Sequence, residues 1–164
     1  METLTAITKR ASTREYLAKP VDKNLLEQIV DAGRRAPSAR AVEPWEFVVV
    51  KERAMLDRLA QLVNNGPFIK DAAACIVVFC VDTKYYLEDG CAAVENILLA
   101  AADAGLGACW VAGDKKEYAP HVAQMLNAPA EMKLICLISL GWPKKEPVQK
   151  KKRALSDVIH WEKF

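Results

Sequence analysis

Residues 88–112 read EDGCAAVENILLAAADAGLGACWVA, and this stretch decides the fold. Glu88 to Ala104 predicts one long helix in which polar residues are few. A helix that is apolar almost all round is buried, and its many alanines allow another backbone to approach closely. Gly105 is a natural residue to end the helix. Ala108 to Ala112 then predicts a strand directly after it.

Further elements are predicted on both sides of this helix. Apolar residues at helical spacing predict helices at residues 3–9, from Asp22 to before Pro37, at 55–63 and at 117–126. Aromatic and β-branched runs predict strands at residues 47–50, 74–81 and 134–140. The second of these is apolar on both faces, which indicates a central position in a sheet. Strands separated by helices predict a sheet covered by helices, an α/β or α+β sandwich.

The length of 164 residues fits one domain spanning residues 1–164. Residues 144–152 form a charged linker with Pro147, the one stretch that resembles a boundary. The tail from Ala154 to Phe164 is apolar enough to dock on another surface. We therefore expect residues 144–164 to be a linker and a tail.

Composition narrows the class of protein. The net charge of +2 argues against bulk attraction to nucleic acid, and we expect no membrane span and no signal peptide. The five cysteines have no zinc or redox-pair spacing and lie among apolar neighbours. We expect free, buried thiols in a reducing cytoplasm. His121 and His160 have no serine or cysteine elbow nearby, so an enzyme of this sequence would take its chemistry from a cofactor.

Two basic clusters are candidates for binding an anion. Arg10, Ser12 and Arg14 alternate by two, which places all three on one side of an extended segment. Two guanidinium groups and a hydroxyl suit a phosphate. Residues 150–153, KKKR, form the second cluster. Taken alone, both clusters also fit solvated charges, and the proline-bounded loop 36–45 also fits an ordinary connection.

The order of these motifs resembles the FMN-dependent nitroreductase family. The chain has RASTREY at residues 10–16, where the family has R-x-S-x-R-x-F/Y, and APSARAVEPWEF at residues 36–47, where the family has A-P-S-x-x-N-x-Q-P-W-x-F. Matches to a family helix follow at Asp89, Ala93, Asn96, Leu99 and Ala101. GLGACW at 105–110, GWP at 141–143 and a late basic pair complete the order. The likeness covers nearly the whole chain.

The resemblance implies an α+β nitroreductase-like sandwich, with a mostly antiparallel central sheet flanked by helices, in an interlocked homodimer that binds FMN. The long alanine-rich helix would form the dimer core, and the tail would contact the partner subunit. The implied flavin-binding residues are Arg10, Ala11, Ser12 and Arg14 with Lys151 and Arg153, then Pro37, Ser38 and Ala39 from the partner, and Ala112 and Gly113 at the flavin N5.

The implied activity is oxidoreduction. NAD(P)H would reduce FMN, and a small planar acceptor such as a nitroaromatic, quinone or enone would then be reduced in ping-pong order. No catalytic side chain and no metal are implied. Ala41 and Glu43 replace the family's asparagine and glutamine. These departures and a short substrate pocket leave two alternatives: an FMN-binding carrier or sensor without turnover, and a basic-tailed interaction domain without flavin.

Overall fold

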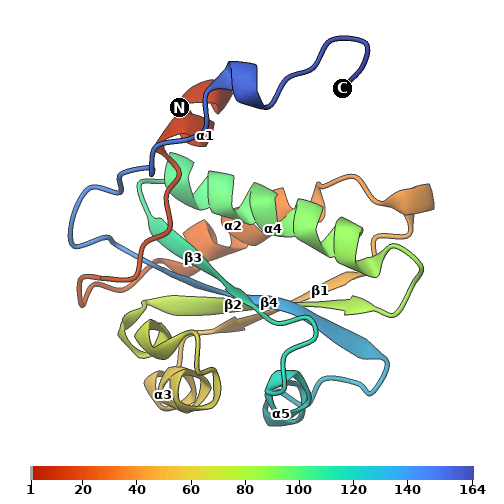
Figure 1. Ribbon diagram of the computed structural model, residues 1–164. Coiled ribbons are helices and arrows are strands. Elements are labelled where there is room, and N and C mark those ends of the chain that lie inside the picture. The colour runs from red at the N-terminus through yellow and green to blue at the C-terminus, as the bar shows by residue number, and fades with distance from the viewer. Residues whose placement is uncertain (1) are drawn as a thin grey trace.

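The computed structural model describes residues 2–164 and contains five α-helices and four β-strands within them (Figure 1). The helices are α1 Thr3–Lys9, α2 Lys23–Arg34, α3 Arg53–Leu62, α4 Tyr86–Asp103 and α5 Ala119–Met125. The strands are β1 Trp45–Val50, β2 Ala74–Val81, β3 Gly107–Ala112 and β4 Met132–Gly141. Every helix and strand predicted from periodicity is present, with ends that differ by a few residues.

The strands form one antiparallel sheet in the order β1-β2-β4-β3. The central strands β2 and β4 are buried along almost their whole length, as the two-sided apolar pattern of residues 74–81 predicts. β3 is an edge strand beside β4. The N-terminal segment covers part of its outer edge, because the Thr13 amide donates to the Ala108 carbonyl at 2.9 Å.

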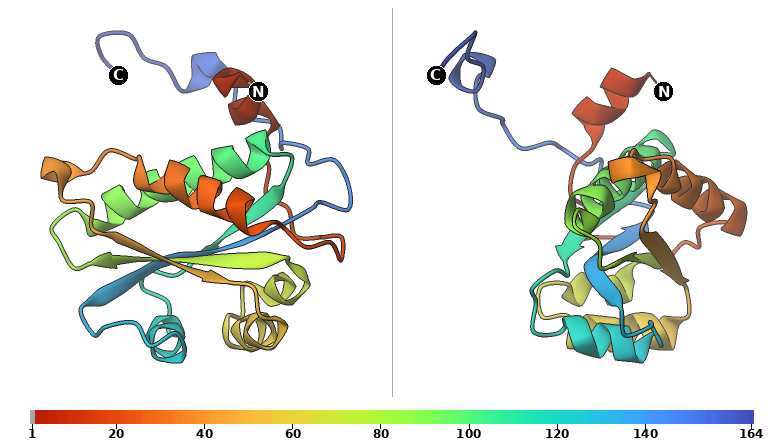
Figure 2. Two further views of the ribbon diagram at one scale, coloured as in Figure 1. Left: turned by 180° about the vertical axis from the view of Figure 1, so that it is seen from behind. Right: turned by 90° about the vertical axis from the view of Figure 1, so that its right-hand side faces the viewer.

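Helices cover both faces of the sheet and make a three-layer sandwich. α2 and α4 lie on one face, and α3 and α5 lie on the other (Figures 1 and 2). A separate apolar core fills each of the two spaces between sheet and helices. α2 and α4 approach closely at Gly33, where an added Cβ would lie 2.7 Å from Cγ1 of Ile97. The predicted α+β sandwich with an antiparallel sheet is confirmed.

The sequence predicts that α4 is buried all round, but within a single chain only one face of the helix is buried. Ala93, Ile97 and Ala101 are fully buried against the sheet. Leu99 lies on the opposite side of the helix and is half-buried, between exposed Glu95 and Asp103. Part of the apolar surface of α4 therefore has no cover from this chain.

The loop between α2 and β1 differs from the stiff, non-helical connection that its prolines predict. A short 3₁₀ turn occupies Ala39–Ala41, and Arg40, Ala41 and Glu43 all have positive φ angles, of 56°, 54° and 49°. The prolines restrict only their own and the preceding residues, so they leave positions 40–42 free to adopt this conformation. Glu43 has a positive φ although it precedes Pro44.

The two chain ends meet beside α4, and the tail then leaves the body of the molecule (Figures 1 and 2). The Gln149 side-chain amide donates to the carbonyls of Ile7 at 3.2 Å and Arg10 at 3.0 Å. Beyond this contact the tail is exposed, including its large apolar residues Leu155, Val158, Trp161 and Phe164. Within residues 2–164, no helix has both the length and the apolar character needed to cross a membrane.

Candidate functional site

The segment that carries Arg10, Ser12 and Arg14 is held in place by the residue between the last two. Thr13 is buried against β3, so tightly that a Cβ on Gly107 would lie 2.5 Å from its Cγ2. Ser12 and Arg14 consequently face outward on the other side of the extended segment. The prediction that alternate residues share one side is confirmed by this arrangement.

These residues line a cavity of about 240 Å³ together with the second basic cluster. Its lining consists of Arg10, Ala11, Ser12, Arg14, Val148, Gln149, Lys150 and Lys152. Four of these side chains are cationic and none is acidic. The Nε atom of Arg10 lies 3.6 Å from a carboxylate oxygen of Glu95, which is half-exposed. The excess of positive charge suits an anion with several acceptor oxygens, such as a phosphate.

The structure separates the four residues of the basic run 150–153. Lys150 and Lys152 line the cavity, whereas Lys151 and Arg153 do not. The Arg153 guanidinium instead donates to the carbonyl of Asp157 in its own tail. The resemblance favours Lys151 and Arg153, whereas the structure places Lys150 and Lys152 at the cavity, next to Gln149, which is bonded to the Arg10 carbonyl.

Arg14 has a second neighbour that sequence reasoning missed. Its guanidinium carbon lies 5.6 Å from the centre of the Phe68 ring, a cation–π distance. Phe68 belongs to a short 3₁₀ turn at Pro67–Asp71, which has no periodic signal of its own. This contact limits the directions in which Arg14 can extend.

Pro37, Ser38 and Ala39 lie toward the other end of α4. The Ala39 amide donates to Oδ1 of Asp89, near the start of α4, at 2.9 Å. Arg10 and Ala11, by contrast, share a cavity with Ala102 and Gly105 at the end of the same helix. Figure 1 shows the loop and the N-terminal segment toward opposite ends of α4. The two predicted groups of flavin-binding residues are therefore not brought together within one chain.

The backbone groups of Ala112, the last residue of β3, and of Gly113, which follows it, have different hydrogen-bond partners. The Gly113 amide donates to the Ile135 carbonyl at 3.0 Å, so it is used within the fold, which corrects the expectation that it faces a flavin. The register pairs Ala112 with Cys136. Hydrogen-bonded and non-hydrogen-bonded pairs alternate in an antiparallel ladder. The backbone groups of Ala112 consequently point away from β4, and its carbonyl accepts from the Tyr118 hydroxyl.

The reactive side chains around the sheet are poorly suited to act as nucleophiles. Burial raises the pKa of the Cys75 and Cys80 thiols to about 12 and raises that of Cys109 as well. A raised thiol pKa lowers the thiolate fraction at neutral pH. The part of the chain that the structure describes contains no group of three or more metal-ligating side chains. The excess of cationic side chains suits an anion, and the chemistry of the site would come from a bound group.

The fold and the lining of the cavity define an α+β sandwich protein with a basic cavity formed by residues 10–14 and 148–152. Comparison with known proteins identifies the family. The model of the nitroreductase family matches residues 7–87 and 69–142 of this chain. The chain belongs to the nitroreductase family, as the order of its sequence motifs predicted.

Similar proteins match along the whole chain. A protein of Archaeoglobus fulgidus, provisionally named NADH dehydrogenase/NAD(P)H nitroreductase, is 34% identical over 173 residues, with 99% of each chain covered. A crystal structure of a protein with the same provisional name from Bacteroides thetaiotaomicron has a TM-score of 0.94 and 35% identity, covering 99% of this chain and 98% of its own. An FMN-dependent nitroreductase of Clostridium difficile has a TM-score of 0.88 and 30% identity, covering 98% and 99%.

Proposed function

We propose that this protein is an FMN-dependent oxidoreductase that uses NAD(P)H to reduce small planar acceptors such as nitroaromatics, quinones or enones. The observation that carries the proposal is the cavity lined by Arg10, Ser12, Arg14, Lys150 and Lys152. Its four cations and one hydroxyl fit the phosphate of FMN. The Clostridium difficile relative is named as FMN-dependent, and the Archaeoglobus relative is named for NAD(P)H.

The residues of this chain would hold FMN by its phosphate and its ring. Arg10 and Arg14 would donate charge-assisted hydrogen bonds to the phosphate, with Ser12 beside them. Lys150 and Lys152 would add positive charge, and Lys151 and Arg153 would reach the site only if the tail moved. The outward N–H of Ala112 would donate at the flavin N5. When bound, FMN would supply the hydride chemistry that the side chains of the site lack.

A second copy of the chain would complete this site. Pro37, Ser38 and Ala39 of the partner subunit would approach the ring, because within one chain they lie toward the opposite end of α4 from Arg10. The half-buried outer face of α4 and the exposed apolar tail both lack cover in a single chain. Burial of these surfaces in a homodimer would remove them from water. The five thiols are unpaired, which supports a cytoplasmic location for the dimer.

The first test is binding of FMN to the purified protein. We expect about one FMN per subunit on acid release, and Arg10→Ala should weaken FMN binding about tenfold, because a hydrogen bond to a charged group contributes about 1.5–3 kcal/mol. Lys9→Ala removes the same charge one position away and outside this cavity, so it serves as the control. A protein that takes up no FMN would refute the proposal.

A paired comparison identifies which lysines of the second cluster contribute. The double variant Lys150→Ala/Lys152→Ala should weaken FMN binding more than Lys151→Ala/Arg153→Ala, because only the first pair lines the cavity. The two variants remove equal charge from the same four residues. A larger effect of the second pair would mean that the tail rearranges when FMN binds.

A second candidate function is a flavin-binding carrier or sensor without turnover. The departures at Ala41 and Glu43 favour it, because the loop beside Ser38 lacks the two side-chain amides that the family has at these positions. Anaerobic mixing with NADH or NADPH separates the candidates. Bleaching of the flavin, and its recovery on addition of a quinone or nitroaromatic, supports the oxidoreductase. Reduction by dithionite but by neither nicotinamide supports the carrier or sensor.

A further inference from the structure

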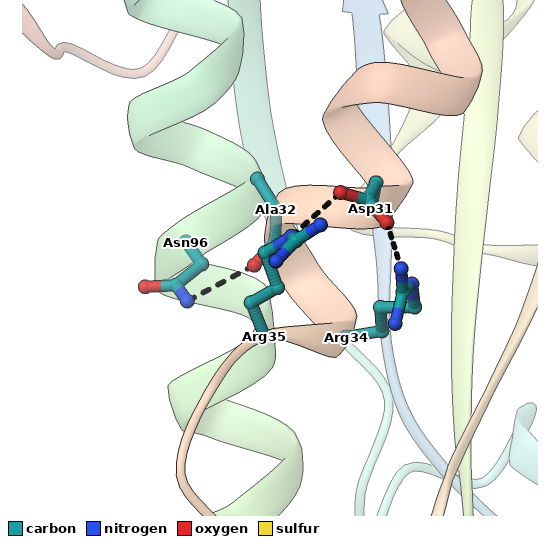
Figure 3. Close-up of polar contacts among 5 residues, drawn as sticks. All are labelled: Asp31, Ala32, Arg34, Arg35 and Asn96. Atoms are coloured by element: carbon teal, nitrogen blue, oxygen red, sulfur yellow. Dashed lines mark hydrogen bonds and ion pairs between the residues drawn. The ribbon is translucent and has the colours of Figure 1, made fainter.

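α4 holds the loop between α2 and β1 at two points. The Nδ2 group of Asn96 donates to the carbonyl of Ala32 in the last turn of α2 at 3.0 Å (Figure 3). Oδ1 of Asp89 accepts from the amide of Ala39 at 2.9 Å. Asp89 and Asn96 are seven residues apart, about two helical turns, so they project from the same side of α4. They therefore hold the chain just before and just inside this loop.

The contact at Asp89 is unusual because a carboxylate is buried there. Asp89 is only 6% exposed. An ionised group that is removed from water needs hydrogen bonds to compensate for lost solvation, and a backbone amide supplies one to Asp89. A hydrogen bond to a charged group is also stronger than one between neutral groups. The contact thus fixes the position of the Ala39 amide more firmly than a neutral acceptor would.

The loop after Ala39 has a strained backbone, which must be held in place by its surroundings. Arg40, Ala41 and Glu43 all lie in the left-handed region, which residues other than glycine adopt only with strain. Three internal bonds restrain the turn. The Ser38 hydroxyl accepts from the amide of Glu43 at 2.9 Å, and the carbonyls of Ser38 and Ala39 accept from the amides of Ala41 at 3.1 Å and Val42 at 3.3 Å. A strained conformation persists only when its surroundings over-determine it. The two contacts from α4 provide that restraint from outside the loop.

A neighbouring polar cluster shows the difference between local and connecting contacts. The two carboxylate oxygens of Asp31 contact the guanidinium groups of Arg34 and Arg35, three and four residues further along the chain (Figure 3). All three side chains are substantially exposed. This cluster supports the end of α2 and does not reach α4. Of the contacts drawn in Figure 3, only the one from Asn96 crosses between the two helices.

We infer that Asp89 and Asn96 are positioning residues that hold residues 36–43 in the conformation presented to FMN across the dimer. The part of this inference that concerns FMN rests on the proposed function. Neither residue needs to touch the flavin, because each acts through a backbone group of α2 or of the loop. The same helix offers its outer face to the partner, so α4 would link loop geometry to dimer geometry.

The inference is tested first without flavin, by amide hydrogen exchange on the apoprotein. Asp89→Leu removes the acceptor while keeping a similar size, and we expect exchange of the residue 39–43 amides to become at least about tenfold faster, with the amides of β2 and β4 unchanged. Asp89→Asn keeps an acceptor oxygen and should restore most of the protection. Asp31→Asn, which alters a carboxylate confined to α2, is the matched control and should leave these amides unchanged.

FMN affinity provides the second readout. Asp89→Leu should raise the FMN dissociation constant about tenfold, since it removes one charge-assisted hydrogen bond, and Asp89→Asn should recover most of this loss. If Asp89→Leu does not fold, Asn96→Asp carries the test, because it has nearly the same size but no N–H group to donate to Ala32.

Each outcome has a defined meaning. Unchanged exchange at residues 39–43 together with unchanged FMN affinity, in a folded Asp89→Leu or Asn96→Asp variant, would overturn the inference. Equal effects of Asp31→Asn would also overturn it, because the loop would then respond to any change of charge nearby. A wild-type protein that binds no FMN would refute the proposed function, while the exchange experiment would still decide whether α4 positions the loop.

Discussion

Gly107→Ala should disturb the candidate phosphate site without altering any residue that lines it. A Cβ at position 107 would lie 2.5, 2.6 and 2.7 Å from Cγ2, Cβ and Oγ1 of Thr13. All three atoms belong to the side chain that is buried between Ser12 and Arg14. Carbon atoms in normal contact are about 3.5–4.0 Å apart, so Thr13 must move by about 1 Å. Such a shift displaces Ser12 and Arg14 on either side of it.

The expected loss of stability has two parts. Overpacking a well-filled site costs about 1–3 kcal/mol. The bond from the Thr13 amide to the Ala108 carbonyl, now 2.9 Å, would lengthen, at a cost of about 1 kcal/mol. A total of about 2–4 kcal/mol lowers the midpoint of thermal unfolding by about 4–16 °C in a domain of this size. FMN binding should weaken about tenfold, because the displaced segment carries two phosphate contacts.

Calorimetry of the apoprotein and titration with FMN measure the two effects, and Gly105 provides the control. Nothing lies within 4 Å of a Cβ at Gly105, whose φ is +74°. Gly105→Ala should therefore cost about 1 kcal/mol through backbone strain and leave FMN affinity unchanged. Thr13→Gly removes all three clashing atoms, so in the double variant with Gly107→Ala the losses should be less than additive. Additive losses, or a Gly107→Ala protein with normal FMN affinity, would refute this reasoning.

Three further predictions use other parts of the molecule. Ala41→Asn should raise the free energy of unfolding, measured by urea titration, by about 0.5–1 kcal/mol. The φ angle at position 41 is 54°, and asparagine tolerates a positive φ better than alanine does. Destabilisation would contradict this. Leu99→Asp, on the outer face of α4, should convert a dimer to a monomer by light scattering, and a monomeric wild type would contradict the proposed dimer. Burial raises the pKa of Cys75 and Cys80 to about 12. Their thiolate fraction at pH 8 should therefore be about a thousandfold below that of an ordinary thiol. Labelling of these two thiols by iodoacetamide, detected by mass spectrometry, should occur only when the protein is unfolded.

The regular elements could be predicted because their signals are local. The apolar run of β2 and the alanine-rich run of α4 are set by residues close in sequence. The 3₁₀ turns at Ala39–Ala41 and Pro67–Asp71 were missed because three to five residues give no periodic pattern. The positive φ angles in the first turn also could not be predicted, because part of their restraint comes from Asp89, which follows Ala39 by fifty residues.

The site was predictable in its components but less so in its assembly. The alternation of Arg10, Ser12 and Arg14 predicts that they share one side, and all three line the same basic cavity. The choice among the lysines of the second cluster depends on where Gln149 anchors the chain, which is a tertiary contact. The amide of Gly113 was misassigned for a similar reason, because the register between β3 and β4 determines which amides of an edge strand point outward.

The basic cavity is lined by two segments, residues 10–14 and 148–152, that lie far apart in the sequence, and this has a consequence for protein synthesis. The bond from Gln149 to the Arg10 carbonyl spans 139 positions of the chain. During translation Arg10, Ser12 and Arg14 emerge early, whereas Lys150 and Lys152 emerge only after all four strands of the sheet. A product that ends after β4, at Gly141, would contain all four strands but would lack residues 148–152, which line one side of the basic cavity. Binding of a phosphorylated cofactor would thus select for chains that extend past Lys152. Closure of the cavity should be among the last steps of folding, because contacts distant in sequence form slowly.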